Sequence, residues 1–230
     1  MSGDTLPAVN LTPKHIDHTL LRPDALASEI DQLCAEGLRF GFATVCVQPS
    51  FVARAARAMR GSPVGVAAVV AFPHGANATA IKVAEARRAI DDGATELDVV
   101  ANLGWIRAGE ITALTDELGA VIHAAGAHAA GAIPVKVILE TALFSSDQNR
   151  RAAQAALAAG AAFLKTSTGF ASGGATVADV ALLREVAGSR ARVKASGGIR
   201  TREQALAMLN AGADRIGASA SIALVAPPPL

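Results

Sequence analysis

The chain has 230 residues, of which 51% are hydrophobic and 18% are charged, so it can bury a sizeable core and lacks the composition of a disordered protein. Its net charge is +1 and its aromatic content is 3%, which argues against a basic or aromatic surface for nucleic acid. This length fits one large domain or two small ones, and α/β barrels often reach it as a single domain.

Short apolar strand patterns alternate with helical patterns along the chain. Strands are expected at residues 15–21, 43–47, 64–71, 95–100, 135–139, 162–165, 192–195 and 215–217. Helices are expected at residues 28–37, 50–60, 78–92, 111–125, 146–159, 176–187 and 201–210, and a last short helix opens at 218–220.

Several helix ends carry specific capping signals. Gly37 is expected to end the first helix. Ser146 or Asp147 is expected to cap the helix that runs to residue 159. Thr201 and Gln204 have the spacing of a capping box.

Eight strands that alternate with eight helical segments predict a parallel sheet closed into a single (β/α)8 TIM barrel. We expect one catalytic domain over residues 1–230, with a leader at 1–13 and a tail at 226–230. A doubly wound open sheet is the alternative, but it would need no eighth strand.

Residues 118–135 are nearly uncharged, which raises the question of a membrane span. Gly126, Gly131 and Pro134 interrupt this segment, so we interpret it as a helix end, a loop and the start of a strand. Residues 1–10 show no signal-peptide pattern, and we therefore expect a cytoplasmic protein with no membrane partner.

The sequence predicts no metal site and no cofactor. Cys34 and Cys46 form neither a metal pattern nor a disulfide framework, and Cys46 is expected to be a small core residue beside the site. The histidines lack ligand spacing and acidic partners; these are His18, His74, His123 and His128.

Lysine is scarce, since it provides only five of the 21 basic residues. Three of the five, Lys136, Lys165 and Lys194, nevertheless lie in strand patterns. Charged residues are rarely placed on buried strands without a partner or a purpose. The structural alternative is that each lysine pairs with a carboxylate or extends its charged end to solvent.

Lys165 ends its strand, and Thr166, Ser167, Thr168 and Gly169 follow it. A primary amine in this position can attack a carbonyl and form a Schiff base, which the guanidinium of Arg cannot do. The hydroxyl-rich turn beside it can hold a phosphate through N–H and O–H groups.

In a barrel, the site lies at the carboxyl ends of the strands. Asp98, Lys136, Lys165 and Lys194 lie late on their strands, so we expect one acid and three amines to meet there. A second ammonium group and partial desolvation both favour a neutral amine. Asp98 could instead pair with an arginine.

The phosphate end is expected at the turns after the sixth to eighth strands. The residues predicted to bind phosphate or substrate are Thr166, Thr168, Gly169, Gly197, Gly198, Gly217 and Ser219. The alternative for Gly197 and Gly198 is a turn without a ligand.

The segment 163–170, with the sequence Phe-Leu-Lys-Thr-Ser-Thr-Gly-Phe, resembles the Schiff-base segment of the deoxyribose-phosphate aldolase family. Further segments that resemble this family are residues 16–21, 72–75, 82–85, 96–102, 135–141 and 193–200. The resemblance covers most of the chain. The segments together are highly specific for this family, whereas no single segment would be.

The resemblance implies a class I aldolase of deoxyribonucleoside catabolism, which cleaves 2-deoxy-D-ribose 5-phosphate reversibly to D-glyceraldehyde 3-phosphate and acetaldehyde. Lys165 would form the Schiff base, Lys194 would lower the pKa of Lys165, and Asp98 would serve as acid and base. The supporting network would comprise Lys136, Asp17, Cys46 and Thr19.

One departure from the family pattern concerns proton transfer. Some members carry a C-terminal tail that ends in a tyrosine, whereas this sequence has no Tyr and ends in Pro-Pro-Pro-Leu. The proton step would then rely on Asp98, Lys194 and water.

Two other function classes stay open at this stage. One is a Schiff-base aldolase with another donor, and the other is a protein that binds a phosphorylated metabolite without turnover. The expected partners are a small phosphorylated sugar and acetaldehyde. The chain could also form a homo-oligomer, either a dimer or a tetramer.

Overall fold

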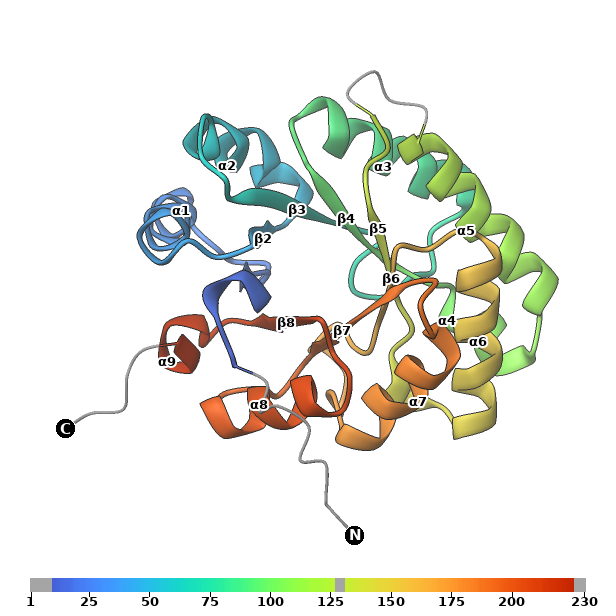
Figure 1. Cartoon of the computed structure of the whole chain (residues 1–230). Helices are drawn as coiled ribbons and strands as arrows, with labels where there is room; N and C mark the ends of the chain where they lie inside the picture. The colour runs from blue at the N-terminus through green and yellow to red at the C-terminus, as the bar shows by residue number, and fades with distance from the viewer. Residues whose placement is uncertain (1–9, 127–130, 226–230) are drawn as a thin grey trace, which may run out of the picture.

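Eight parallel strands close into a barrel in the computed structural model, which describes residues 10–126 and 131–225 (Figure 1). The strands are β1 (Ile16–Leu20), β2 (Thr44–Val47), β3 (Gly65–Val70), β4 (Glu96–Val100), β5 (Val135–Ile138), β6 (Phe163–Lys165), β7 (Arg192–Ser196) and β8 (Arg215–Ala218). Each strand pairs with the next and β8 pairs with β1, so the predicted TIM barrel is confirmed and the open sheet is excluded.

The helices lie around this ring of strands (Figure 1). They are α1 (Ala27–Phe40), α2 (Val52–Met59), α3 (Thr79–Asp91), α4 (Leu103–Ala108), α5 (Ile111–Gly126), α6 (Ser146–Ala158), α7 (Val177–Ala187), α8 (Arg202–Asn210) and α9 (Ser221–Val225). Three short 3₁₀ helices are η1 (Pro13–His15), η2 (Pro49–Phe51) and η3 (Thr141–Leu143). Of the predicted leader, residues 1–9 lie outside the described residues, as does the whole predicted tail, 226–230.

Helix α4 was not predicted, because six residues are too few to show a helical period. Its start is nevertheless specified locally, since the Asn102 side chain accepts a hydrogen bond from the Trp105 N–H at 3.2 Å. Gly109, with φ of 75°, ends it in the left-handed region that glycine adopts freely.

The prediction that Gly37 ends the first helix is wrong. Gly37 lies inside α1, and Gly41, with φ of 67°, follows the last helical residue. A Cβ on Gly37 would lie 2.7 Å from Cγ1 of Val45, so glycine is needed there for close packing of α1 on β2. Close packing and helix capping both require glycine, so the sequence pattern alone does not show which of the two roles Gly37 has.

The cap of α6 is Ser145 rather than Ser146 or Asp147, because the Ser145 hydroxyl accepts a hydrogen bond from the Gln148 N–H at 3.3 Å. The capping box of α8 is confirmed. Gln204 N–H donates to the Thr201 hydroxyl, and the Gln204 side chain accepts from the Thr201 N–H at 3.1 Å.

The apolar core lies mainly between the strands and the helices. Alternate residues along each strand point outward, such as Val45 and Val47 on β2 and Leu97 and Val99 on β4, and these belong to the large buried cluster. Inside the barrel, Leu21, Cys46, Ala67 and Val69 form a small apolar cluster, and Phe163 lies two residues before Lys165 on the same face of β6. Other inward positions hold charged side chains, such as Asp98 on β4.

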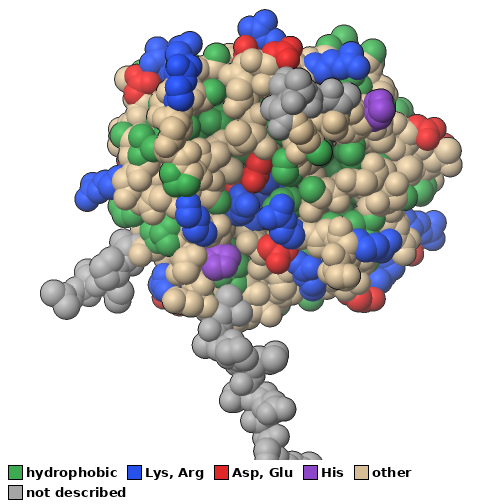
Figure 2. All heavy atoms as spheres, turned by 45° about the horizontal axis from the view of Figure 1, so that its top comes forward, with side chains coloured by type: hydrophobic (Ala, Val, Ile, Leu, Met, Phe, Trp, Pro, Cys, Tyr) green, Lys and Arg blue, Asp and Glu red, His purple; other side chains and the backbone are tan. Residues whose placement is uncertain are grey.

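The uncharged segment 118–135 divides into the end of α5 and the start of β5, as expected, with residues 127–130 outside the described part. Among the described residues, no helix is long and apolar enough to cross a membrane. Figure 2 shows basic and acidic side chains interspersed over the face it presents.

Substitution of Gly37 by alanine is expected to destabilise the protein, although alanine favours a helix by about 1 kcal/mol. The added methyl group would overlap the Val45 side chain, and overpacking of this kind costs about 1–3 kcal/mol. Gly119→Ala in α5 is the matched control, because nothing lies within 4 Å of the added Cβ, and it should stabilise by about 0.5–1 kcal/mol. Chemical denaturation measures both, and stabilisation by Gly37→Ala would contradict the packing argument.

Candidate active site

Three lysines surround one carboxylate inside the barrel. Lys165 on β6 and Lys194 on β7 are direct partners in the sheet, and their ammonium groups lie 2.6 and 2.7 Å from Oδ2 of Asp98 on β4. Lys136, the partner of Asp98 on β5, donates to Oδ1 of the same carboxylate at 2.6 Å. All four side chains are buried, so the structure brings together the acid and the three amines that the sequence predicted.

A second buried carboxylate, Asp17 on β1, joins this group. Its Oδ2 lies 2.6 Å from the Lys194 ammonium, and its Oδ1 accepts from Arg215 on β8 at 2.5 Å and from the Thr44 hydroxyl at 2.8 Å. Glu96, two residues before Asp98, lies 2.6 Å from the Lys136 ammonium.

Burial and charge act in opposite directions on these groups. Burial alone would raise the pKa of Asp98, but Lys136, Lys165 and Lys194 outweigh it and hold that pKa well below its usual value. Burial would lower the pKa of Lys194, but Asp17 and Asp98 outweigh it and raise that pKa. Lys194 therefore stays protonated and Asp98 stays ionised at neutral pH.

Lys165 differs from its two neighbours in the direction of its shift. Burial lowers its pKa, Asp98 opposes this, and the positive charge of Lys194 lowers it further. The net shift is downward, whereas the pKa of Lys136 is raised because Asp98 and Asp17 outweigh its burial. Lys165 is thus the amine of the cluster that most easily becomes a neutral nucleophile.

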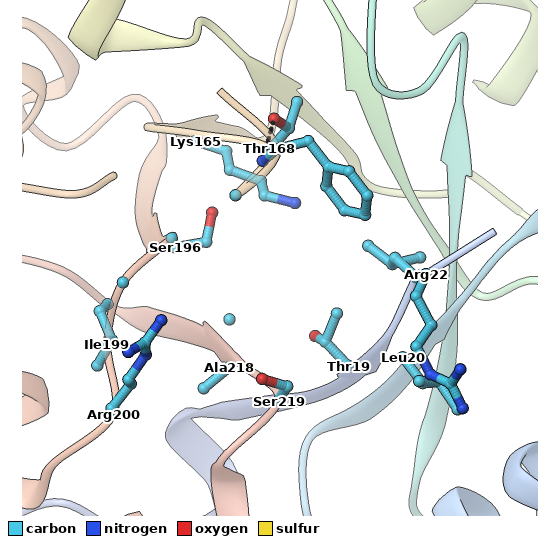
Figure 3. Close-up of a pocket in the computed structure, with 16 residues that line it drawn as sticks. Thr19, Leu20, Arg22, Lys165, Thr168, Ser196, Ile199, Arg200, Ala218 and Ser219 are labelled. Atoms are coloured by element: carbon cyan, nitrogen blue, oxygen red, sulfur yellow. Dashed lines mark hydrogen bonds between the residues drawn. The ribbon is translucent and has the colours of Figure 1, made fainter. Parts of the chain in front are cut away.

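A cavity of about 330 Å³ opens beside Lys165 (Figure 3). In that view, Thr19, Ser196 and Ser219 surround it together with Lys165, while Arg22 and Arg200 lie on opposite sides. It is lined by Thr19, Leu20, Leu21, Arg22, Lys165, Thr168, Gly169, Phe170, Ser196, Gly197, Gly198, Ile199, Arg200, Gly217, Ala218 and Ser219. An amine, two glycine turns and several hydroxyls thus share one cavity, which suits a carbonyl compound that carries an anionic group.

A sequence profile of the DeoC/LacD family aldolases matches residues 13–224. The chain belongs to this family. It is 49% identical to the deoxyribose-phosphate aldolase of Caldanaerobacter subterraneus subsp. tengcongensis, across 92% of this chain and 91% of the relative. It is 47% identical to the enzyme of the same name from Desulfitobacterium hafniense, across 91% of this chain and 95% of the relative.

Solved structures agree with this membership of the DeoC/LacD family. A structure described as a tetrameric deoxyribose phosphate aldolase from Aeropyrum pernix superposes with a TM-score of 0.84 at 31% identity, across 92% of this chain and 88% of that chain. A protein described as QR15, an aldolase, superposes with a TM-score of 0.87 at 38% identity, across 93% of both chains.

Six residues predicted for the site do not line its cavity. Asp17, Asp98, Lys136 and Lys194 form the buried ion-pair cluster, and the other two are Thr166 and Cys46. Thr166 is buried, where its hydroxyl donates to the Ser196 carbonyl at 3.1 Å and accepts from the Ser196 N–H at 3.1 Å, so it joins β6 to β7. Cys46 is buried on β2, and burial raises the pKa of its thiol to about 11, which keeps it neutral. Strand alternation turns the Thr166 side chain toward β7, whereas Cys46 belongs to the small apolar cluster inside the barrel.

Thr168 lines the cavity, but its hydroxyl is already bound. It donates to Glu140 at 2.5 Å and accepts from the Phe170 N–H at 3.0 Å. Glu140 is buried two residues after the end of β5, and its φ of 54° is unusual for a residue other than glycine. Sequence reasoning missed this role of Glu140, although a carboxylate shortly after a buried strand was a signal.

The glycines of the cavity serve different purposes. Gly197 and Gly198 have φ of 88° and 78°, so the turn after β7 needs the left-handed backbone that glycine allows. Gly217 is needed for space instead, because a Cβ there would lie 2.9 Å from Cε of Lys194. Ser219 follows Gly217 in the cavity wall.

Glu96 and Arg215 were also missed by sequence reasoning. Each occupies the first position of its strand and is two residues from an inward-facing position, Asp98 and Gly217 respectively. The two-residue period of a strand was therefore the available signal. Across the described residues, no group of three or more His, Cys, Asp or Glu could hold a metal ion.

Proposed function

We propose that this chain is a deoxyribose-phosphate aldolase that cleaves 2-deoxy-D-ribose 5-phosphate reversibly to D-glyceraldehyde 3-phosphate and acetaldehyde. The observation that carries this proposal is the buried Lys165, whose pKa is lowered and which lines a cavity with glycine turns for a phosphate. Relatives of that name, 47–49% identical over most of the chain, support the substrate.

Lys165 would attack the C1 aldehyde of the open-chain sugar, and loss of water would give an imine. Deprotonation of the C3 hydroxyl then breaks the C2–C3 bond, releases glyceraldehyde 3-phosphate and leaves the electron pair in an enamine. Protonation of C2 and hydrolysis of the imine release acetaldehyde and regenerate the amine. The imine supplies the electron sink, so the proposed reaction needs neither metal nor cofactor.

Asp98 and the protonated Lys194 would carry the protons of these steps, with water as relay. Their contact at 2.7 Å places an acceptor and a donor beside the Lys165 nitrogen. Four further residues would support Asp98 and Lys194. Lys136 and Asp17 would do so through their ion pairs, Thr19 by lining the cavity, and Cys46 as a neutral neighbour. The 230 residues contain no Tyr, so none of them supplies a phenol to the proton transfer.

The phosphate would bind at the turns formed by Gly197, Gly198 and Ser219, where the backbone can approach an anion closely. Gly169 would complete this wall, and Gly217 would leave room for Lys194. Arg200, which is exposed and lines the same cavity, would add positive charge. Arg22 also lines it but pairs with Asp24 at 2.9 Å, so its charge is partly compensated.

We also propose one catalytic domain, a cytoplasmic location and self-association. The single closed barrel supports the first. Self-association is supported by the related Aeropyrum pernix structure, which is described as tetrameric. Both a dimer and a tetramer fit this proposal.

Borohydride reduction in the presence of acetaldehyde is expected to leave a two-carbon adduct on Lys165. Of the three lysines around Asp98, Lys165 is the one with a lowered pKa, and burial is the main cause; Lys136 and Lys194 remain charged. Peptide mapping by mass spectrometry identifies the modified residue, and Lys165→Met should remove the adduct. An adduct confined to another lysine would refute the assignment, and trapping by a different aldehyde alone would indicate another donor.

Replacement of Lys194 by leucine is expected to lower kcat by about 100-fold or more, because both a charge and a proton donor are lost. Since Lys194 lowers the pKa of Lys165, its removal should also move the onset of imine formation to higher pH. Lys194→Arg keeps the positive charge but not the titratable proton. The pH at which imine formation begins should therefore return closer to the wild-type value than kcat does. Circular dichroism checks folding, because two buried carboxylates lose a partner.

Removal of the Ser219 hydroxyl by Ser219→Ala is expected to raise KM for the phosphorylated sugar by about 10-fold, the usual effect of one hydrogen bond to a charged group. Unphosphorylated 2-deoxyribose is the control substrate, and its KM should stay unchanged. Steady-state kinetics with both sugars measures the difference. An equal change for both would argue that Ser219 does not contact the phosphate.

A further inference from the structure

Two charged residues extend the lysine cluster toward the amino ends of the strands. Glu96 is the first residue of β4 and Arg215 the first of β8, and their side chains lie 3.4 Å apart at Oε2 and Nη1. Arg215 also contacts Asp17 at 2.5 Å, and its guanidinium lies over the Phe163 ring, 5.5 Å from the centroid. We call these two residues the floor pair.

The cluster with its floor pair has unequal numbers of positive and negative groups. The cations are Lys136, Lys165, Lys194 and Arg215, and the carboxylates are Asp17, Glu96 and Asp98, all joined by ion pairs of 2.5–3.7 Å. When every group is ionised, one positive charge is in excess. An excess charge in the interior is costly, so the loss of one proton from one cation is favoured.

The contacts decide which cation gives up the proton. Arginine stays charged in a protein, so Arg215 makes the excess permanent and only a lysine can relieve it. Lys136 has ion pairs with Asp17, Glu96 and Asp98, and Lys194 has two, with Asp17 and Asp98. Within the described residues, the ion pair of Lys165 is with Asp98 alone.

We propose that Arg215 and Glu96 are positioning residues that set the ionisation of Lys165 from the floor of the barrel, with opposite signs. Arg215 favours the neutral amine by adding an irreversible positive charge, and Glu96 opposes it by adding a negative one. This inference rests on the proposed function of Lys165 and deepens it, and neither floor residue lines the cavity.

The remaining groups that face the cluster add no buried charge. Arg192, the first residue of β7, lies over the Phe163 ring at 4.0 Å from its centroid, but it is exposed and therefore screened by solvent. Cys46 on β2 is a neutral thiol, since its pKa is about 11, and β3 contributes the apolar Ala67 and Val69. Arg22 and Arg200 line the cavity and are exposed, so solvent screens their charges. Both residues are present in every variant below, so their effect on the pKa of Lys165 is the same throughout.

The test compares three variants, Glu96→Gln, Arg215→Gln and the double variant, with the full-length wild-type protein. The readouts are the pH midpoint of borohydride trapping of acetaldehyde on Lys165 and the acid limb of kcat/KM, which reports groups of the free enzyme. Arg215→Gln should move both midpoints to higher pH by about one unit, and Glu96→Gln should move them to lower pH by a similar amount. The double variant removes one charge of each sign, so both midpoints should return to the wild-type values.

The direction of the shifts separates this proposal from a structural role. Damage to the fold would lower activity in every variant without opposite shifts that cancel in the double variant. Unchanged midpoints, or shifts of the same sign, would overturn the proposal. If Arg215→Gln alone fails to fold, the acid shift of Glu96→Gln and its reversal in the double variant decide the question. Failure to trap acetaldehyde on wild-type Lys165 would instead refute the proposed function.

Discussion

Inside the barrel, three ammonium groups hold the Asp98 carboxylate, and the site is arranged around this interaction. Asp98 contacts Lys136, Lys165 and Lys194 at 2.6, 2.6 and 2.7 Å, and none of these residues is adjacent to another in the sequence. A buried ion is tolerated only with excellent pairing, because desolvation costs several kcal/mol for each charge. The closed barrel supplies that pairing, and removal of one member leaves the others uncompensated.

This charged interior changes where the stability of the fold comes from. In most barrels of this class, bulky apolar side chains fill the interior. Here several inward positions hold charged side chains beside a small apolar cluster that includes Cys46 and Val69, whereas the large apolar cluster lies between strands and helices. The outer shell therefore stabilises the protein, and the inner layer is free to tune the pKa values of its amines.

Backbone strain is concentrated at the same end of the barrel as the cavity. Ala71 and Glu140 have φ of 53° and 54°, and each directly follows or nearly follows the carboxyl end of a strand. Both are held by hydrogen bonds, since Ala71 N–H donates to Glu85 at 2.8 Å and Glu140 accepts from Thr168. Such strain persists only where the surroundings over-determine the backbone, which fits turns that must present groups to a substrate in fixed positions.

The barrel could be predicted from the amino-acid sequence, because strand and helix periods and caps such as Thr201 are local signals. The sequence also selected Asp98, Lys165 and Lys194, since a charge on a buried strand needs a purpose. Three features could be seen only in the folded chain. Gly37 packs against β2 instead of capping a helix, Thr166 turns away from the cavity, and Glu96 and Arg215 join the lysine cluster. These depend on strand register and on contacts between distant segments, and a one-residue difference in register reverses the face on which a side chain lies.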